Sequence, residues 1–407
     1  MRALTALKGI WRHPGFWLGT LSVLILLAAW NTGESRLYQF GVLLSATLIA
    51  GYWLPRRNVR GIHVSRELPA ESHEGDEIEV ALQLQAKGFF ARYMLQVRDR
   101  LPFLDQPDYP VLIARLRGRQ QFQYSITCER RGIHTIGPLQ VSSEFPLALM
   151  RVSLPLTDSL TEIRVLPSTF PIQGLMLAGQ TGFPTDSHQV GPASRGQDTF
   201  AGVRDYRRGD SMRHIHWRAS ARRGEWVVRE YEQIENAELV IVLNADPGAN
   251  PGSGRESCFE YAVRIAASLA RYATENGHKV GVFCQQMDGV RWLAPDSGWH
   301  HYRHALEFLA GVEADTPGDY RQAVEQAATL AGRQGRLWLF HTAESPSTIP
   351  AAPALSSRID QAPVQVAFDA PSFRQRAATQ APSLRQMAVP DLYWISRGAN
   401  LAEVFAS

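Results

Sequence analysis

The sequence predicts a multidomain α+β protein: an N-terminal transmembrane helical hairpin, a small antiparallel β-sandwich and a C-terminal α/β domain. Three observations predict this order. Two apolar runs open the chain, a period-two pattern follows them, and β-branched runs then alternate with helical periods. A chain of 407 residues has room for two or three domains. We place the segments at residues 1–60 (anchor), 61–170 (β-sandwich), 171–237 (loop and arginine-rich stretch) and 238–407 (α/β domain).

The membrane hairpin is predicted from two apolar runs, Phe16 to Trp30 and Leu37 to Leu54, joined by a short polar turn. The second run approaches the lower length limit for crossing hydrocarbon. Aromatic side chains lie near the ends of both runs, as they do at membrane interfaces. Basic residues flank the outer ends: Arg2, Lys8 and Arg12 before the hairpin, and Arg56, Arg57 and Arg60 after it. The positive-inside rule therefore puts both termini in the cytoplasm.

A signal peptide followed by a secreted domain is the alternative. It is disfavoured because no small-x-small cleavage site ends the first run and the second run follows at once. The three cysteines, Cys128, Cys258 and Cys284, are far apart and lack metal-ligand spacing. They predict neither a disulfide framework nor a zinc site, and they suit a reducing compartment. The net charge of +3 is too small to indicate a partner.

The β-sandwich is predicted from clean alternation of apolar and polar residues in three short segments, 78–85, 93–99 and 121–126. Glycine-containing turns separate these segments. An Arg-Arg-Gly sequence at 130–132 is interpreted as a turn between two strands, with phosphate binding as the alternative. Residues 174–197 are rich in Gly, Ser, Thr, Pro and Gln, which predicts a loop.

The C-terminal segment predicts a mostly parallel sheet with helices on both faces, because strand-like and helix-like runs alternate. Expected strands are 239–243, 279–284, 337–340, 364–368 and 392–395, and expected helices are 259–272, 302–310 and 320–330. Residues 346–358 are expected to form a surface loop.

The stretch from Asp198 to Tyr231 places apolar anchors among paired charges. Its residues match a family pattern at Phe200, Gly202, Arg204, Tyr206, Gly209, Asp210, Arg213, Ile215, Trp217, Ser220, Ala221, Arg222, Val228, Arg229 and Glu230. The chain thus resembles the domain of unknown function 58 family of bacterial proteins, although His216 stands where that family usually has Asp. The Arg-Arg-Gly and Gly-Pro residues at 130–138 fit the same pattern.

The resemblance implies a C-terminal domain similar to the von Willebrand factor type A fold. It also implies a bacterial inner-membrane protein that works beside a MoxR-type AAA+ ATPase and other membrane proteins. Type A domains can bind a divalent cation through Asp-x-Ser-x-Ser. This chain has Asn244, Ala245, Asp246, Pro247 and Gly248 at these positions. Thr316 could supply the threonine that such domains contribute from a distant part of the sequence. We therefore expect a degenerate site with no metal and no cofactor, although Asp246 could still bind a ligand.

Other chemistry is weighed against simpler roles. His300 and His304 are one helical turn apart and could clamp a metal, but a surface cluster is the simpler interpretation. His214 and His216 flank Ile215 and would share one face of a strand. Phosphate-loop, dinucleotide and metalloprotease motifs are absent from the sequence. Ser220 or Asp210 could serve a hydrolase, and the basic residues could bind nucleic acid or anionic lipid.

We expect a non-enzymatic, membrane-anchored scaffold or adaptor that binds no nucleic acid and whose soluble domains face the cytoplasm. The arginine-rich stretch is expected to be a salt-bridged junction that also presents a partner surface. In that prediction Trp217 packs inward, and four arginines form ion pairs with acidic residues of the same stretch. The arginines are Arg204, Arg213, Arg222 and Arg229, and the acids are Asp205, Asp210, Glu225 and Glu230.

Overall fold

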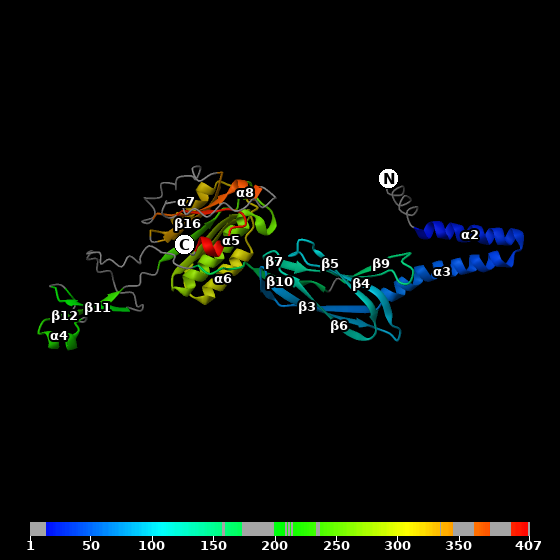
Figure 1. Ribbon diagram of the computed structural model, residues 1–407, viewed down its shortest axis with the longest axis horizontal. Coiled ribbons are helices and arrows are strands. Elements are labelled where there is room, and N and C mark those ends of the chain that lie inside the picture. Colours follow the sequence, from blue (N-terminus) through cyan, green and yellow to red (C-terminus); the bar gives the residue numbers. More distant parts are fainter. Residues whose placement is uncertain are drawn as a thin grey trace. The chain divides into compact units, whose positions relative to one another are not determined.

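The computed structural model describes residues 14–156, 159–172, 199–207, 210, 212, 215–232, 237–333, 335–344, 362–374 and 392–405. For residues 14–16, 199–202 and 229–232 it describes the backbone alone. The chain forms two compact units, Met1–Ser168 and Thr169–Ser407 (Figure 1).

Two apolar helices begin the first unit, α2 (Pro14–Thr32) and α3 (Ser35–Val59), and they pack side by side (Figure 1). Ser22 and Ser45 share a hydrogen bond of 2.7 Å between the two helices. Gly41 lets the backbones approach, since a Cβ there would collide with the side chain of Leu26. The 25 residues of α3 are long and apolar enough to cross a membrane, whereas the apolar part of α2 is shorter.

The rest of the first unit is a β-domain. Its strands are β1 (Ile62–Glu67), β2 (Glu71–His73), β3 (Glu77–Ala86), β4 (Arg92–Arg100), β5 (Asp108–Leu116), β6 (Arg119–Thr127), β7 (Gly132–Ile136), β8 (Leu139–Ser143), β9 (Val152–Leu156) and β10 (Thr161–Leu166). They form sheets in the orders β1-β3-β6, β5-β4-β8-β9 and β2-β10-β7. The three segments with period-two alternation are strands, and residues 128–131 connect β6 to β7 as the turn interpretation predicts. The prediction of a purely antiparallel domain is wrong at one place, because β2 and β10 pair in parallel.

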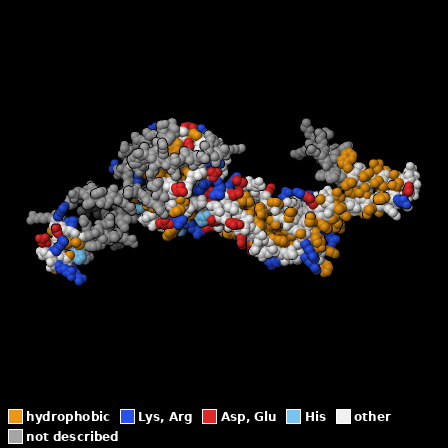
Figure 2. Space-filling view, viewed as in Figure 1, with side chains coloured by type: hydrophobic (Ala, Val, Ile, Leu, Met, Phe, Trp, Pro, Cys, Tyr) orange, Lys and Arg blue, Asp and Glu red, His pale blue; other side chains and the backbone are white. Residues whose placement is uncertain are grey.

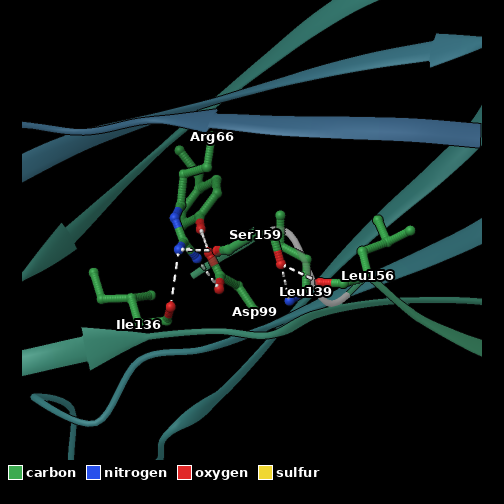
Figure 3. Close-up of polar contacts among 7 residues, drawn as sticks. Arg66, Asp99, Ile136, Leu139, Leu156 and Ser159 are labelled. Atoms are coloured by element: carbon green, nitrogen blue, oxygen red, sulfur yellow. Dashed lines mark hydrogen bonds and ion pairs between the residues drawn. The ribbon is translucent and has the colours of Figure 1, made fainter. Parts of the chain in front are cut away.

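Side chains from the first two sheets meet in one apolar core, to which Leu82, Leu84, Leu95, Val97 and Phe103 contribute fully buried side chains. A polar network lies within it (Figure 3). Arg66 of β1 forms an ion pair with Asp99 of β4, and both side chains are almost completely buried. Arg66 also donates to the carbonyl oxygens of Ile136 at 3.1 Å and Ser159 at 2.8 Å. Tyr124 of β6 donates to the other carboxylate oxygen of Asp99 at 3.1 Å, so the network joins the two sheets.

The second unit contains a six-stranded sheet in the order β15-β14-β13-β16-β17-β18. The strands are β13 (Glu238–Leu243), β14 (Lys279–Gln286), β15 (Gly289–Asp296), β16 (Gly335–Ala343), β17 (Val364–Asp369) and β18 (Leu392–Ile395). All neighbours pair in parallel except β15, which runs antiparallel to β14. This is a doubly wound order, and its direction of winding reverses between β13 and β16.

Helices cover both faces of this sheet (Figure 1). The helices are α5 (Cys258–Glu275), α6 (Trp299–Ala310), α7 (Tyr320–Ala331), α8 (Ala370–Arg374) and α9 (Leu401–Val404), with 3-10 turns η3 (Pro247–Ala249) and η4 (Gly254–Glu256). The amphipathic helix α7 packs on β13, β14 and β16, burying Val324 and Ala327 against Val240 and Leu339. Helix α5 packs on β13 and β14 and contacts α6. The alternation of side chains along β13 places α5 on the opposite face.

The strands and long helices expected in the α/β domain are present, and one strand of its six-stranded sheet, β15, was not predicted. β15 has the sequence GVRWLAPD and is half exposed along most of its length. Because β15 is an edge strand, it does not need a continuous run of buried apolar residues. Its proline also argues against a strand, so the sequence shows no clear two-residue period there. The surface loop expected at 346–358 lies outside the described residues.

Candidate partner surface on the arginine-rich hairpin

The arginine-rich stretch forms a small hairpin of its own. Strand β11 (Thr199–Asp205) pairs antiparallel with β12 (Val227–Glu232), and helix α4 (Trp217–Arg223) lies in the connection. Ile215 bridges to Val228, and the side chains of Ile215, Val227 and Val228 are buried. Gly224 ends α4 in the left-handed conformation, with φ of 77°. We call residues 199–232 the arginine hairpin.

One ion pair orders the loop that follows β11. Arg204 donates to both carboxylate oxygens of Asp210, each at 2.8 Å, and the backbone N–H of Arg207 donates to Asp210 at 2.8 Å. These bonds to Arg204 and Arg207 lower the pKa of Asp210 to about 2. The expected pairing of Arg204 with one of the acids is therefore confirmed, with Asp210 as the partner.

Replacing Asp210 with Asn should destabilise the loop locally by about 1–2 kcal/mol, the value of a bidentate pair discounted for solvent screening at the partly exposed Arg204. Because the folded pKa of Asp210 is below its unfolded value of about 3.9, this stabilisation is complete above about pH 4 and is lost as the pH falls towards 2. Hydrogen exchange at the Arg207 amide measures it. Asp205→Asn is the matched control, since Asp205 and Arg223 form an exposed pair at 3.7 Å. Equal protection in wild type and Asp210→Asn would contradict the prediction.

Ser220 holds α4 against β12. Its side chain is buried, its hydroxyl accepts from the Val227 amide at 3.0 Å, and it can donate to the His216 carbonyl at 3.1 Å. His216 caps α4, its Nδ1 accepting from the Ala219 amide at 3.2 Å. The prediction that His216 is a strand residue is therefore wrong, because it begins a helix. These bonds give Ser220 and His216 structural roles, and the low pKa of Asp210 makes it a poor proton donor near neutral pH.

The expectation that Trp217 packs inward is wrong. Its side chain is 60% exposed, and Trp226 at 50% and Met212 at 53% are exposed as well. The described part of the hairpin buries three aliphatic side chains, Ile215, Val227 and Val228, and this small core encloses neither tryptophan. Tyr206 supports Trp226 from one side, with ring centroids 5.3 Å apart. The hairpin therefore presents large apolar side chains to solvent.

Basic residues of α4 line a hollow on the same hairpin. The hollow, of about 470 Å³, is bounded by His216, Arg218, Ala219, Arg222 and Arg223. Of these three arginines, only Arg222 is part of the family pattern. Arg222 is exposed, and its expected pairing with an acid stays a prediction. Three guanidinium groups around one hollow favour an anionic group there.

Several predicted site residues lie outside what the structure describes. Gly209, Arg213 and His214 are not described, and only the backbone is described for Arg229 and Glu230, which are in β12. Glu225 is exposed in the turn after α4.

The positions expected to form a degenerate metal site do come together. Asn244 and Asp246 follow β13, and the Thr316 amide donates to the Ala245 carbonyl at 3.1 Å. Their side chains bond locally: Asn244 accepts from the Asp246 amide, Asp246 accepts from the Gly248 amide, and the Thr316 hydroxyl donates to Asp315. The cavity among them is about 10 Å³, enough for about one water molecule. Within the described residues no group of three His, Cys, Asp or Glu side chains could hold a metal ion.

The donor set beside β13 therefore fits Mg²⁺ poorly, since the two carboxylates that line the cavity, Asp246 and Asp319, already accept from the amides of Gly248 and Arg321. We expect Mg²⁺ to bind with a dissociation constant of about 1 mM or weaker, because ligand charge sets affinity at such sites. Isothermal calorimetry on the full chain in detergent tests this. Micromolar affinity that Asp246→Ala abolishes would show a working metal site.

His300 and His304 lie one turn apart on α6 with ring centroids 4.3 Å apart, as the sequence predicts. Among the described residues no acid or cysteine joins them in a ligand set. They belong to an exposed stretch at the start of α6.

The fold and hairpin define a class: a chain with apolar N-terminal helices, a β-domain, and a doubly wound α/β domain preceded by an arginine hairpin. Residues 202–369 match the family described as "Protein of unknown function DUF58", so this part of the chain is similar to that family. The uncharacterized protein YeaD of Bacillus subtilis is 26% identical over 116 residues, which is 28% of this chain and 27% of the relative. The chain thus matches about a quarter of that relative's length.

Among solved structures, a CARDB domain from Pyrococcus furiosus is similar over 26% of this chain and 94% of its own length, with 12% identity and a TM-score of 0.19. A beta-glucosidase from Listeria innocua is similar over 26% of this chain and 16% of its own, with 13% identity and a TM-score of 0.16.

Proposed function

We propose that this protein is a membrane-anchored, non-enzymatic adaptor whose arginine hairpin binds a partner protein. The observation that carries the proposal is the exposure of Trp217 and Trp226 on the same hairpin as the hollow lined by Arg218, Arg222 and Arg223. Tryptophan and arginine are the residue types that most often dominate binding energy at protein interfaces. The polar groups that would serve catalysis, Ser220 and Asp210, are already committed to holding the hairpin together.

The family resemblance supplies the candidate partner, a MoxR-type AAA+ ATPase of a bacterial cell. The basic hollow favours an acidic segment on that partner, and the exposed tryptophans favour an apolar anchor beside it. The anchor would be α2 and α3 in the inner membrane, with the soluble units in the cytoplasm as the flanking basic residues indicate. In this proposal the α/β domain is similar to a von Willebrand factor type A domain, which agrees with its doubly wound order and antiparallel edge strand.

Hydrolysis and nucleic-acid binding fit the hairpin less well. A nucleophilic Ser220 would need a free hydroxyl and a nearby base, yet its hydroxyl bonds to backbone groups on two sides. A nucleic-acid surface would need an uninterrupted basic face, whereas Asp205 and Glu225 are exposed among the arginines.

Binding of the full chain to the purified MoxR-type ATPase of the same genome tests the proposal. Trp217→Ala should weaken binding by about 30-fold or more, the loss of an interface hot spot, while leaving stability unchanged. Trp299→Ala is the matched control, because Trp299 on α6 is 61% exposed and Trp217 is 60% exposed. Wild-type affinity in Trp217→Ala, or equal losses in both variants, would exclude the hairpin as the partner surface.

A further inference from the structure

The end of α3 has the composition of a membrane interface. Tyr52 and Trp53 are 51% and 63% exposed there, and Pro55, Arg56 and Arg57 follow. Arg56 lies over the Tyr52 ring, 3.5 Å from its centroid. Aromatic residues followed by arginines mark the level at which a spanning helix leaves hydrocarbon and enters the headgroups.

The β-domain is tied directly to this end of α3. Asn58 donates to the Tyr93 carbonyl at 2.6 Å and to Ser143 at 2.7 Å, and accepts from the Tyr93 amide at 3.1 Å. Arg92 donates to the carbonyl oxygens of Arg57, Arg60 and Lys87. These bonds fix β4, β8 and the β3–β4 loop at one level along the helix.

The β3–β4 loop exposes two large aromatic side chains at that level. Phe89 is 84% exposed and Phe90 is 64% exposed. The guanidinium of Arg57 lies over the Phe90 ring, 4.6 Å from its centroid. Lys87 is exposed in the same loop. Two adjacent exposed phenylalanines cost solubility and do not stabilise the core, so their position among cations points to a surface that covers them.

A second loop, residues 147–150, also lies against α3. Leu149 packs so near Gly51 that a Cβ at Gly51 would lie 3.0 Å from it, and Arg56 contacts the sulfur of Met150 at 3.1 Å. Leu147 in this loop is 48% exposed. Hydrophobic side chains cover α2 and α3 and continue onto the adjoining end of the β-domain, with Lys and Arg side chains among them (Figure 2).

We propose that this end of the β-domain lies on an anionic lipid bilayer, with Phe89, Phe90 and Leu147 inserted at headgroup level around α3. The inference rests on the proposed anchoring of the chain by α3. Phenylalanine and leucine would enter the boundary between headgroups and acyl chains, and Arg57 and Lys87 would face lipid phosphates. The surface is continuous with a helix long enough to span, which makes lipid the occupant. Docking would hold the β-domain at a fixed height above the bilayer.

Three full-length variants, each labelled with an environment-sensitive dye at one new cysteine, test this in vesicles carrying lipid-attached quenchers. The three native cysteines are buried, so the new thiol is the accessible one. Leu43→Cys reports the anchor, at a position on α3 that is 66% exposed. Phe89→Cys reports the proposed docking surface. Ile133→Cys is the matched control, because Ile133 is 57% exposed but lies in β7, at the end of the domain farther from α3 (Figure 1).

In vesicles with phosphatidylglycerol we expect strong lipid quenching at positions 43 and 89 and none at 133. In pure phosphatidylcholine, quenching at 89 should fall while that at 43 stays. If the label at position 43 is quenched but the label at position 89 is as little quenched as that at 133, the docking is overturned and the anchor stands. A label at 89 that is shielded from aqueous iodide yet unaffected by lipid quenchers would show a protein contact instead. No quenching at 43 would overturn the anchor, and the docking with it.

Discussion

Replacing Asp99 with Ala should lower the free energy of unfolding of the β-domain by about 3–5 kcal/mol, because it leaves the Arg66 guanidinium buried without its counter-ion. Both side chains are essentially inaccessible, at 1% and 0% exposure. The hydroxyl of Tyr124 would lose its acceptor in the same step (Figure 3). Burial, followed by the nearby charge of Asp99, raises the pKa of Tyr124 in the wild-type protein, so this phenol is neutral and acts as a hydrogen-bond donor to the carboxylate.

The loss should appear in hydrogen exchange at the amides of β1, β4 and β6, with the α/β domain as an internal reference. Arg66→Met combined with Asp99→Leu is the control, since replacing a buried pair by apolar residues of similar volume is often neutral or stabilising. The exposed Arg130–Asp105 pair in the same domain offers a second control, because its removal should cost about 0–1 kcal/mol. If Asp99→Ala and Asp105→Ala destabilise the domain equally, the buried network does not join the two sheets as we describe.

Replacing Tyr320 with Phe should cost about 2–4 kcal/mol, although it removes a single oxygen atom. The Tyr320 hydroxyl donates to the Val242 carbonyl at 3.0 Å and accepts from the Phe340 amide at 2.9 Å. These two groups belong to neighbouring strands, β13 and β16, where the ladder between the strands ends. Each would be left buried without a partner, at about 1–3 kcal/mol for each group.

The Phe340 amide gives a local measurement of this effect. Its hydrogen exchange should become faster in Tyr320→Phe by more than that of Leu337, which lies within the paired part of β16. Thermal unfolding of the full chain in detergent should show a lower transition for the α/β domain. An unchanged exchange rate at the Phe340 amide would mean that β13 and β16 hydrogen-bond to each other directly at this point without the tyrosine hydroxyl.

The prediction of the β-domain depended on alternation alone, and it worked because each strand buries one face. Val80, Leu82 and Leu84 are buried and alternate with the less buried residues Glu79, Ala81, Gln83 and Gln85. The continuous apolar run of β13 likewise requires cover on both faces, which α5 and α7 provide. The edge strand β15 needs no such run, and this is why periodicity missed it. The parallel pairing of β2 and β10 was missed because the two strands are far apart in the sequence.

The arginine hairpin shows the limit of the same reasoning. Its mixture of charges and aromatic residues indicated a folded element, and the family pattern marked the residues. Charge and spacing could not choose which acid Arg204 would bind, because Asp205, Asp210 and Glu225 were all near in sequence. Only the turn after β11 brings both oxygens of Asp210 within 2.8 Å of that guanidinium. The exposure of Trp217 is likewise a result of tertiary structure, because the core of the arginine hairpin is too small to enclose its side chain.

The sequence by itself determined the order of the segments, the helical character of the N-terminal apolar runs and the alternation of strands and helices in the C-terminal unit. These follow from local periodicity, which each segment carries within itself. The tertiary structure decided which distant groups meet: Arg66 with Asp99 across two sheets, Asn58 with Tyr93 at the end of α3, and Tyr320 between β13 and β16. Such pairings depend on the packing of several elements at once, and no single segment of sequence contains that information.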